Sequence, residues 1–390
     1  MRTAGLFAGI GGIELGLHAA GHETELFCEI LPSAGAVLRS RWPGLPIHLD
    51  VTTLRSLPES VDLISAGFPC QDLSQAGTTA GLDGLRSGLV TEVFRLAKGC
   101  AGRRRNLLLE NVPFMLQLKG GDAMRRVIAA LEELKYRWAW RVVDTFGFGL
   151  PQRRERVYLV ASAHFDPADV LLCDEAPLER PKTTISQRAH GFYWTEGRGG
   201  LGWAHDAVPT LKNGSTIGIA SPPAVLLPDG RIIKPDIRDA ERLQGLAENW
   251  TLPAEEVVRA GFRWSLVGNA VSVPVAAWLG RRLTEQGRYD TARDRSFPTE
   301  GKLPRAARYD GHTRHSVAIG SDPLGIAPPS LATFLRYPGE PLSVRATAGF
   351  LSRTRQAKLT FEPGFIEAVE KHLERVQGQA PDYSAEKRVA

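Results

Sequence analysis

The chain has 390 residues, of which 43% are hydrophobic and 23% are charged, a composition typical of a folded protein and not of a disordered one. Its length exceeds one average domain, so we expect two or three domains, or one large core with insertions. No apolar run approaches the ~20 residues that cross a bilayer, and the N-terminal sequence lacks the pattern of a signal peptide, which excludes the membrane and secreted classes and indicates the cytoplasm.

The cysteines and the charge distribution limit which kinds of site and partner the chain can have. None of the four cysteines is spaced as a zinc-binding CxxC pair, and four are too few for a disulfide framework, so no metal site is expected. In a reducing compartment a single thiol can serve as a nucleophile. The net charge is +5, and residues 281–358 hold 14 basic against 7 acidic side chains. This surplus suits a polyanionic partner, and a solvated charged face explains it equally well.

The first 161 residues alternate between short apolar runs and helical patterns. The expected strands are residues 3–7, 25–30, 46–49, 61–66, 107–109 and 157–161. The expected helices are residues 13–21, 34–41 and 123–134. Strands alternating with helices predict a parallel α/β sheet with crossover helices.

The alternation stops near residue 162. Residues 162–235 contain many Gly and Pro residues, which predicts an inserted, loop-rich domain of small strands. Helical periodicity returns at residues 239–246 and 273–283. Residues 286–330 are rich in Arg, Gly and Pro and are expected to form a linker or a loosely packed extension. Residues 362–376 carry apolar side chains at helical spacing, which predicts an amphipathic helix.

A glycine-rich turn (FAGIGG, residues 7–12) separates the first expected strand from the first helix. Glycines let a ligand approach the backbone, and the helix N-terminal amides point at it, so the turn suits a nucleotide-like ligand. The spacing is not that of the dinucleotide fingerprint, and a tight turn without a ligand has the same pattern. Glu29 ends the second strand, where an acidic residue commonly binds a ribose diol, and Asp50 follows the third, where an adenine amino group could bind. Either could instead be a surface carboxylate.

A cysteine and a carboxylate follow neighbouring strands. Cys70 lies in residues 67–77 (GFPCQDLSQAG), with polar neighbours that a buried structural cysteine would not prefer. Glu110 ends the next expected strand. Because ligands bind at the carboxyl ends of strands in open α/β sheets, the two side chains form a candidate pair for covalent catalysis.

Six segments occur in the order of the signature motifs of one enzyme family. They are residues 7–12, Pro69-Cys70-Gln71, Glu110-Asn111-Val112, Gln152-Arg153-Arg154-Glu155-Arg156, Arg242-Leu243-Gln244-Gly245 and Gly268-Asn269-Ala270-Val271. The chain therefore resembles the DNA cytosine-5 methyltransferases over roughly residues 1–283, apart from the variable stretch near 162–237.

The resemblance implies an α/β fold with a Rossmann-like S-adenosylmethionine-dependent methyltransferase domain, a smaller target-recognition domain and a C-terminal extension. The implied boundaries are residues 1–161 and 238–285 for the catalytic domain, 162–237 for target recognition, and 286–390 for a basic extension that ends in the amphipathic helix. That extension could supply phosphate contacts, or its helix could pack on the core or on a partner.

The resemblance also implies roles for individual residues. The residues implied to bind S-adenosylmethionine are Phe7, Gly9, Ile10, Gly11, Gly12, Glu29, Ile30, Asp50, Val51, Pro69, Leu89, Asn269 and Val271. Where many relatives have Ser, this chain has Ala270, which removes one hydroxyl and puts a minor cofactor contact in doubt. The implied catalytic residues are Cys70, Glu110, Asn111, Arg154 and Arg156.

In the implied reaction, the Cys70 thiolate adds to C6 of cytosine and makes C5 reactive. Glu110 acts on N3 as the acid, and Arg154 and Arg156 hold the base, the carboxylate or a phosphate. The target base is flipped out of double-stranded DNA. The residues implied to contact DNA are Gln71, Ser74, Gln75, Arg86, Thr210 and Leu211. Arg242 is expected to form a scaffold ion pair.

Three alternatives remain at this point. One branch of the family methylates a tRNA cytosine, but it usually has almost no recognition insert, whereas this chain devotes roughly 75 residues to one. A catalytically silent DNA-binding regulator would not need Cys70, Glu110 and Arg156 together. A dehydrogenase is disfavoured because the glycine turn lacks the GxGxxG spacing. The expected partners are DNA and either a separate cognate restriction endonuclease or other defence-system proteins.

Overall fold

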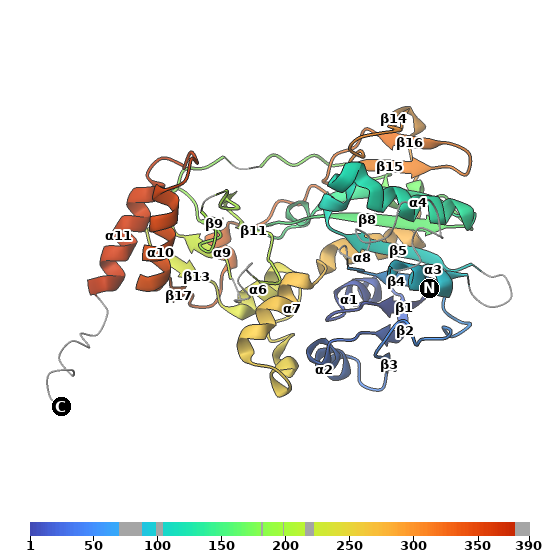
Figure 1. The fold of residues 1–390 in the computed structure, drawn as a ribbon, viewed down its shortest axis with the longest axis horizontal. Coiled ribbons are helices and arrows are strands. Elements are labelled where there is room, and N and C mark those ends of the chain that lie inside the picture. Colours follow the sequence, from blue (N-terminus) through green and yellow to red (C-terminus); the bar gives the residue numbers. More distant parts are fainter. Residues whose placement is uncertain (70–87, 99–103, 181, 198, 215–221, 379–390) are drawn as a thin grey trace.

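The computed structural model describes residues 1–69, 88–98, 104–180, 182–197, 199–214 and 222–378, which form two packed units, each built around a β-sheet (Figure 1). The larger sheet has ten strands in the order β14-β16-β15-β6-β8-β5-β4-β1-β2-β3. Its parallel part comprises β1 (Arg2–Leu6), β2 (Glu23–Cys28), β3 (Ile47–His48), β4 (Leu63–Ala66) and β5 (Asn106–Asn111). The predicted α/β fold with a parallel sheet is confirmed.

The other half of this sheet is antiparallel. Its strands are β6 (Arg137–Asp144), β8 (Glu155–Ser162), β14 (Asp294–Ser296), β15 (Ala306–Tyr309) and β16 (Arg314–Val317). Sequence patterns predicted β8 but neither β6 nor the three late strands. Residues 294–317 are therefore part of the catalytic sheet, whereas the sequence predicted a linker or a loose extension there.

Helices cover both faces of the larger sheet because alternate strand residues point to opposite sides. Leu107 and Leu109 of β5 belong to a core shared with α3 (Val90–Ala97) and α4 (Asp122–Glu133). Leu108 points the other way, into a core shared with α1 (Gly12–Ala19), α5 (Ala168–Leu171) and α8 (Val273–Thr284).

Helices α1 and α8 pack unusually closely although they lie far apart in the sequence. A Cβ at Gly16 would lie 2.5 Å from the Cβ of Ala276, and a Cβ at Gly280 would lie 2.7 Å from that of Ala20. The two glycines thus let the helix backbones approach each other. This contact brings residues near 270 against the glycine turn.

The smaller unit has a five-stranded antiparallel sheet. Its strands, in spatial order, are β10 (Ala204–His205), β9 (His190–Phe192), β12 (Ala224–Leu226), β13 (Ile232–Lys234) and β17 (Glu340–Pro341). Helices α10 (Val344–Arg355) and α11 (Phe365–Gly378), red in Figure 1, complete its core. The unit therefore combines residues 189–234 with residues 340–378.

Short elements connect the two units. The parallel pair β7 (Gln152–Arg153) and β11 (Val208–Pro209) joins them directly. The remaining α-helices are α2 (Pro32–Arg41), α6 (Ile237–Leu243), α7 (Arg263–Asn269) and α9 (Leu331–Phe334). Within the described ranges, no helix is long and apolar enough to cross a membrane.

Candidate active site

Three candidate segments follow the carboxyl ends of adjacent parallel strands. β1, β4 and β5 pair with one another in parallel, so their carboxyl ends lie at one edge of the sheet. The glycine turn follows β1, residues 67–69 follow β4, and Glu110 and Asn111 end β5. This is the edge at which open α/β sheets bind ligands.

The glycine turn leads from β1 into α1 through left-handed backbone conformations. Phe7, Gly9 and Gly11 have φ values of 53°, 56° and 78°. A Cβ at Gly11 would overlap the ring of Trp42, whereas a Cβ at Gly9 would meet open space. Gly11 is thus required by packing, and Gly9 leaves room for a ligand beside the backbone.

Glu29, which follows β2, fixes this turn. Its Oε2 accepts a hydrogen bond of 2.7 Å from the backbone N–H of Gly9, and its Oε1 accepts one of 2.8 Å from that of Leu31. Burial raises the pKa of the Glu29 carboxyl, and the backbone donors oppose that shift. Each oxygen retains a further lone pair, so the carboxylate can also accept hydrogen bonds from a ribose diol.

One cavity connects the glycine turn with Glu110. It is bounded by the turn, by the residues that follow α7, and by the ends of β4 and β5. The predicted cofactor residues that line it are Phe7, Gly9, Ile10, Gly12, Asn269 and Val271. Gly67 and Glu110 line the same cavity. The structure therefore brings residues from the first and the last of the quoted motifs to the strand edge that carries the Glu110 carboxyl.

Two residues from later in the chain, Trp250 and Val271, contact the glycine turn directly. A Cβ at Gly12 would lie 2.6 Å from the carbonyl oxygen of Val271. The indole N–H of Trp250 donates a 2.9 Å hydrogen bond to the carbonyl of Ile10. Trp250 was not among the predicted site residues, because nothing in the local sequence shows that its indole reaches the glycine turn.

Seven predicted cofactor residues lie outside the lining of this cavity: Gly11, Glu29, Ile30, Asp50, Val51, Pro69 and Leu89. Ile30 is 66% exposed and precedes Leu31, which does line the cavity. The Oδ1 atom of Asp50 accepts hydrogen bonds from the backbone and hydroxyl of Thr52, which lower the pKa of the Asp50 carboxyl. Val51 is buried in the core, Leu89 packs against that core, and Pro69 is exposed.

Glu110 and Arg156 form an ion pair across two neighbouring strands. The Nε atom of Arg156 on β8 lies 3.0 Å from Oε1 of Glu110 on β5, and both side chains are nearly buried. Burial raises the pKa of Glu110, while the positive charges of Arg156 and Arg154 oppose the shift. A raised pKa favours the neutral carboxyl, which can donate a proton.

Asn111 links the ends of β5 and β4. Its side-chain amide donates a 2.9 Å hydrogen bond to the carbonyl of Phe68, and its Oδ1 accepts one of 2.8 Å from the N–H of Val112. The amide therefore fixes residue 68 relative to the Glu110 strand. Asn111 itself is buried, so its position supports a role in holding the site together.

Arg154 has different partners from Arg156. Arg154 is almost completely buried and donates hydrogen bonds to the carbonyls of Leu211, Gly268 and Ala270. Sequence patterns grouped Arg154 with Arg156 as a residue that holds the base, the carboxylate or a phosphate. The structure instead directs its guanidinium at the backbone.

The two residues predicted to approach DNA from the smaller unit lie beside this arginine. The Thr210 hydroxyl donates a 2.7 Å hydrogen bond to the carbonyl of Arg153. Leu211 is 2% exposed and packs with residues such as Ala240 and Leu243, so its side chain would have to leave this core to touch a base. Cys70, Gln71, Ser74, Gln75 and Arg86 lie outside the described residues.

Two buried glutamines belong to the quoted motifs, but no local sequence pattern indicates what they bind. The Nε2 of Gln152 donates to the carbonyl of Leu243 at 2.8 Å, and its Oε1 accepts from the N–H of Leu211 at 3.1 Å. Gln244 donates to the carbonyl of Val267 at 2.8 Å. Gln152 on β7 is thus bonded to the end of α6, and Gln244, which follows α6, is bonded to α7. Only the tertiary structure reveals these contacts.

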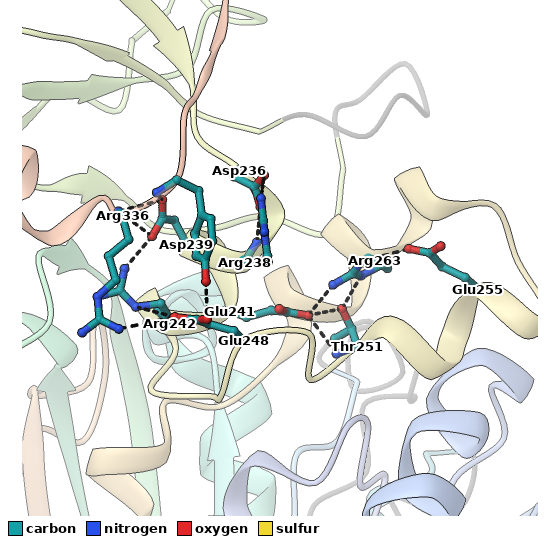
Figure 2. A network of polar contacts seen from close by, with 11 residues as sticks. Asp236, Arg238, Asp239, Glu241, Arg242, Glu248, Thr251, Glu255, Arg263 and Arg336 are labelled. Carbon is teal, nitrogen blue, oxygen red and sulfur yellow. Dashed lines mark hydrogen bonds and ion pairs between the residues drawn. The ribbon is translucent and has the colours of Figure 1, made fainter.

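A polar network around α6 connects it to the C-terminal segment (Figure 2). Arg242 pairs with Asp239 at 2.5 Å, and Asp239 accepts hydrogen bonds of 3.1 Å from the backbone N–H of Arg336. On the other side of the helix, Arg263 pairs with Glu241 at 2.9 Å. The prediction that Arg242 forms a scaffold ion pair is confirmed.

Comparisons with known proteins agree with this geometry. Residues 1–191 match the family described as C-5 cytosine-specific DNA methylase. Type II methyltransferase M2.BsuMI of Bacillus subtilis (strain 168) is 46% identical and covers 96% of this chain and 99% of its own length. Type II methyltransferase M1.ScrFI of Lactococcus lactis subsp. cremoris is 30% identical and covers 72% of this chain and 77% of its own length.

Solved structures share the fold at low sequence identity. The S. pombe Dnmt2 methyltransferase has a TM-score of 0.51 and 17% identity, and the match covers 73% of this chain and 98% of that one. The Entamoeba histolytica methyltransferase EhMeth also has a TM-score of 0.51, at 14% identity, with the same coverage of both chains. Because the similarity to M2.BsuMI extends over nearly the whole chain, this protein belongs to the C-5 cytosine-specific DNA methylase family and is a DNA cytosine-5-methyltransferase.

Proposed function

We propose that the enzyme methylates C5 of a cytosine within a specific sequence of double-stranded DNA, with S-adenosylmethionine as the methyl donor and through a covalent bond between Cys70 and C6. The observation that carries this proposal is the cavity shared by the glycine turn and Glu110. A methyl donor and a cytosine ring must meet in one space, and this cavity is lined both by residues of the glycine turn and by Glu110.

The residues around the glycine turn fit S-adenosylmethionine, which supplies an electrophilic methyl group. The open space beside Gly9 admits a ligand against the backbone. Glu29 offers carboxylate oxygens to the ribose hydroxyls from a position fixed by Gly9 and Leu31. Asn269 and Val271 close the cavity from the other side. Ile30, exposed next to Leu31, is available to pack on the adenine.

The proposed reaction makes a poor carbon nucleophile reactive. The Cys70 thiolate forms a bond to C6, and Glu110 donates a proton to N3, so the electron pair of the C5–C6 bond becomes available at C5. C5 then attacks the methyl group, whose bond to the sulfonium sulfur breaks, so that S-adenosylhomocysteine leaves. Loss of the C5 proton to a base re-forms the C5–C6 double bond, breaks the C6–S bond and returns the thiolate, and N3 gives its proton back to Glu110. Arg156 holds Glu110 in place throughout, and its guanidinium is the proposed partner of the base's O2.

Access to C6 requires that the cytosine leave the stacked duplex, so base flipping is part of the proposal. The smaller unit is the proposed target-recognition domain, since it faces the catalytic unit across the β7–β11 pair. Of the residues 162–237 expected from the sequence, we assign residues 189–237 to this domain, because α5 packs in the core of the larger sheet. Residues 330–378 complete the core of the smaller unit. Thr210 is the proposed approach to the bases from this unit. A separate cognate restriction endonuclease is also proposed, because two relatives carry Type II names.

Trapping with duplex DNA that contains 5-fluorocytosine tests the mechanism. Fluorine at C5 cannot leave as a proton does, so the wild-type enzyme with S-adenosylmethionine should form a complex that survives denaturing electrophoresis. Cys70→Ser should form none. A trapped complex that persists in Cys70→Ser would remove Cys70 as the nucleophile, and trapping on tRNA but not on duplex DNA would replace the proposed substrate.

A further inference from the structure

The Arg154 guanidinium is a buried charge that binds three backbone carbonyls. Nη1 donates to Leu211 at 3.1 Å, and Nη2 donates to Gly268 at 3.2 Å and to Ala270 at 2.6 Å. The residue is 1% exposed. Burial, together with the charge of Arg156, lowers the pKa of Arg154 to about 9, so the group stays protonated at neutral pH. A permanent buried charge with carbonyl partners indicates a fixed structural link.

The three carbonyls belong to two segments, one at the cavity and one in the smaller unit. Gly268 and Ala270 lie at the C-terminal end of α7, where helix carbonyls lack partners within the helix and a cation is favoured. Ala270 and its neighbour Asn269 line the cofactor cavity. Leu211 belongs to the segment of the smaller unit that is proposed to approach DNA. One guanidinium therefore joins the cofactor wall to the recognition segment.

The backbones of the two segments are also in direct contact. A Cβ at Gly268 would overlap the backbone carbonyl of Lys212 and would lie 2.7 Å from the N–H nitrogen of Asn213. The N–H of Leu211 donates to Gln152, two residues before Arg154, so the recognition segment is held from both sides. A displacement of residues 211–213 would therefore move the turn at residues 268–270.

We propose that Arg154 is a positioning residue that couples cofactor binding to DNA binding, and that it does not itself contact the cytosine. This proposal rests on the proposed function, because it requires that the cavity bind the cofactor and that residues 210–213 meet DNA. A ligand that orders one segment orders the other through the three hydrogen bonds. Coupling of this kind is reciprocal: DNA tightens cofactor binding by the same factor by which the cofactor tightens DNA binding.

The test compares two buried arginines with the same chemistry. Lysine has one ammonium in place of a planar fork and cannot hold three carbonyls in this geometry, so Arg154→Lys should break the link. Arg141→Lys is the matched control. Arg141 is also fully buried and donates to the carbonyls of Gly320, Leu171 and Asp174, none of which belongs to the cavity or to the recognition segment.

Calorimetry with S-adenosylhomocysteine, with and without a saturating duplex carrying the methylated motif, measures the coupling factor. The wild type and Arg141→Lys should bind S-adenosylhomocysteine at least about fivefold more tightly when DNA is present, a typical lower bound for allosteric coupling. Arg154→Lys should lose this enhancement while it still binds each ligand alone. Gly268→Ala, which pushes the segments apart without altering Arg154, should lose it as well.

The outcomes separate this proposal from the one on which it rests. Failure of the wild type to bind S-adenosylhomocysteine or to methylate any duplex would overturn the proposed function. Binding of both ligands without enhancement in the wild type, or full enhancement in folded Arg154→Lys, would overturn the coupling alone. If Arg154→Lys does not fold, as a thermal melt would show, Gly268→Ala decides: retained enhancement there also overturns the coupling.

Discussion

Glu110 has a raised pKa although two arginine charges lie close to it, because burial outweighs their attraction for the carboxylate. This balance suits a group that must hold a proton for N3 and must also stay anchored, since the Arg156 contact fixes the side chain while burial keeps its neutral form accessible. In an exposed position this carboxyl would have no proton to donate to N3, because an exposed glutamate is ionised at neutral pH.

We expect Glu110→Gln to lower kcat by about 100- to 10,000-fold, the usual contribution of a positioned acid. The wild-type rate should also fall as pH rises through the raised pKa of Glu110, because the protonated form is the donor, and this descending limb should be absent from the residual activity of the variant. Glu155→Gln is the control: Glu155 lies on the neighbouring strand β8 and pairs with Arg305 at the surface, at 2.7 Å. Steady-state kinetics over pH checks both expectations, and an unchanged rate in Glu110→Gln would contradict the role.

Glu29 provides a test of the cofactor wall. We expect Glu29→Ala to weaken binding of S-adenosylhomocysteine by roughly 10- to 100-fold, since it removes a charged acceptor and releases the N–H of Gly9. Glu25→Ala should leave the affinity unchanged, because Glu25 on β2 pairs with Arg2. Calorimetric titration of each variant measures the difference. Equal affinities in the two variants would rule out Glu29 as part of the cofactor site.

Glu14 is a buried carboxyl that the mechanism does not use. Its Oε1 accepts a 2.7 Å hydrogen bond from Ser65, and its Oε2 has no hydrogen-bond partner among the described residues. Burial raises the pKa of Glu14 to about 7. The folded state therefore holds a proton that the unfolded state releases near pH 4.5. The contribution of the protonated carboxyl to the free energy of unfolding is complete at low pH and is lost as pH rises towards 7.

Between pH 5 and pH 8, we expect the free energy of unfolding of the wild type to fall by about 3 kcal/mol more than that of Glu14→Gln. This follows from the pKa difference between the folded and unfolded states, worth ~1.4 kcal/mol per pKa unit. Denaturant unfolding at several pH values gives the free energies. Glu59→Gln, at an exposed position, should follow the wild-type pH dependence. Parallel curves for the wild type and Glu14→Gln would show that Glu14 does not titrate in this range.

Residues at strand ends could be predicted from the sequence, and residues set by long-range packing could not. Glu29 and Glu110 follow apolar runs that the sequence already identifies as strands, so their place at the sheet edge follows from local pattern. The burial of Leu211 depends on α6, which follows it by some 30 residues. The carbonyl partners of Arg154 likewise come from residues 57 and more positions away.

The same distinction holds for whole elements. The amphipathic helix predicted over residues 362–376 is observed as α11 (Phe365–Gly378), because its apolar side chains recur at helical spacing. Strands β14 to β16 were not predicted because they are short and carry arginines. Arg308 pairs with Asp294 at 2.6 Å and Arg314 pairs with Glu132 at 2.6 Å, so charged strand residues are stabilised by distant carboxylates.

Helix α11 makes the C-terminal region part of the smaller unit's core. Phe365 is fully buried and contacts Phe192 and Trp203, with ring centroids 5.1 and 4.8 Å away. We expect Phe365→Ala to destabilise this unit by about 3–5 kcal/mol and Phe361→Ala, which is only partly buried, by less. Thermal unfolding measures both. Binding of S-adenosylhomocysteine should survive below the lowered melting point, because the cofactor wall belongs to the other unit.

Across the whole molecule, the basic surplus of residues 281–358 is matched by carboxylates elsewhere. Arg293 pairs with Glu175 at 2.5 Å, Arg305 pairs with Glu155 at 2.7 Å and Arg314 pairs with Glu132 at 2.6 Å, whereas Arg308 pairs with Asp294 within the same stretch. Much of this charge therefore fastens the late strands to the catalytic body. Deleting residues 286–390 would remove strands β14 to β17 and helices α9 to α11, so it would test folding and not phosphate contacts.

The two units form one functional assembly because the chain crosses between them repeatedly. Residues 1–161 build the catalytic sheet, residues 189–234 build the smaller sheet, residues 294–317 return to the first, and residues 340–378 return to the second (Figure 1). A site that lies where these crossings meet can respond to ligands on both units, which is the arrangement that the proposed sequence-specific methylation requires.

Bisulfite sequencing of DNA from cells that express the wild type, Glu110→Gln or Glu155→Gln tests the central claim most directly. We expect unconverted cytosines to concentrate in one short motif with the wild type and with Glu155→Gln, and to be absent with Glu110→Gln. Complete conversion with all three proteins, although the wild type is folded and binds S-adenosylhomocysteine, would contradict cytosine-5 methylation of duplex DNA by this enzyme.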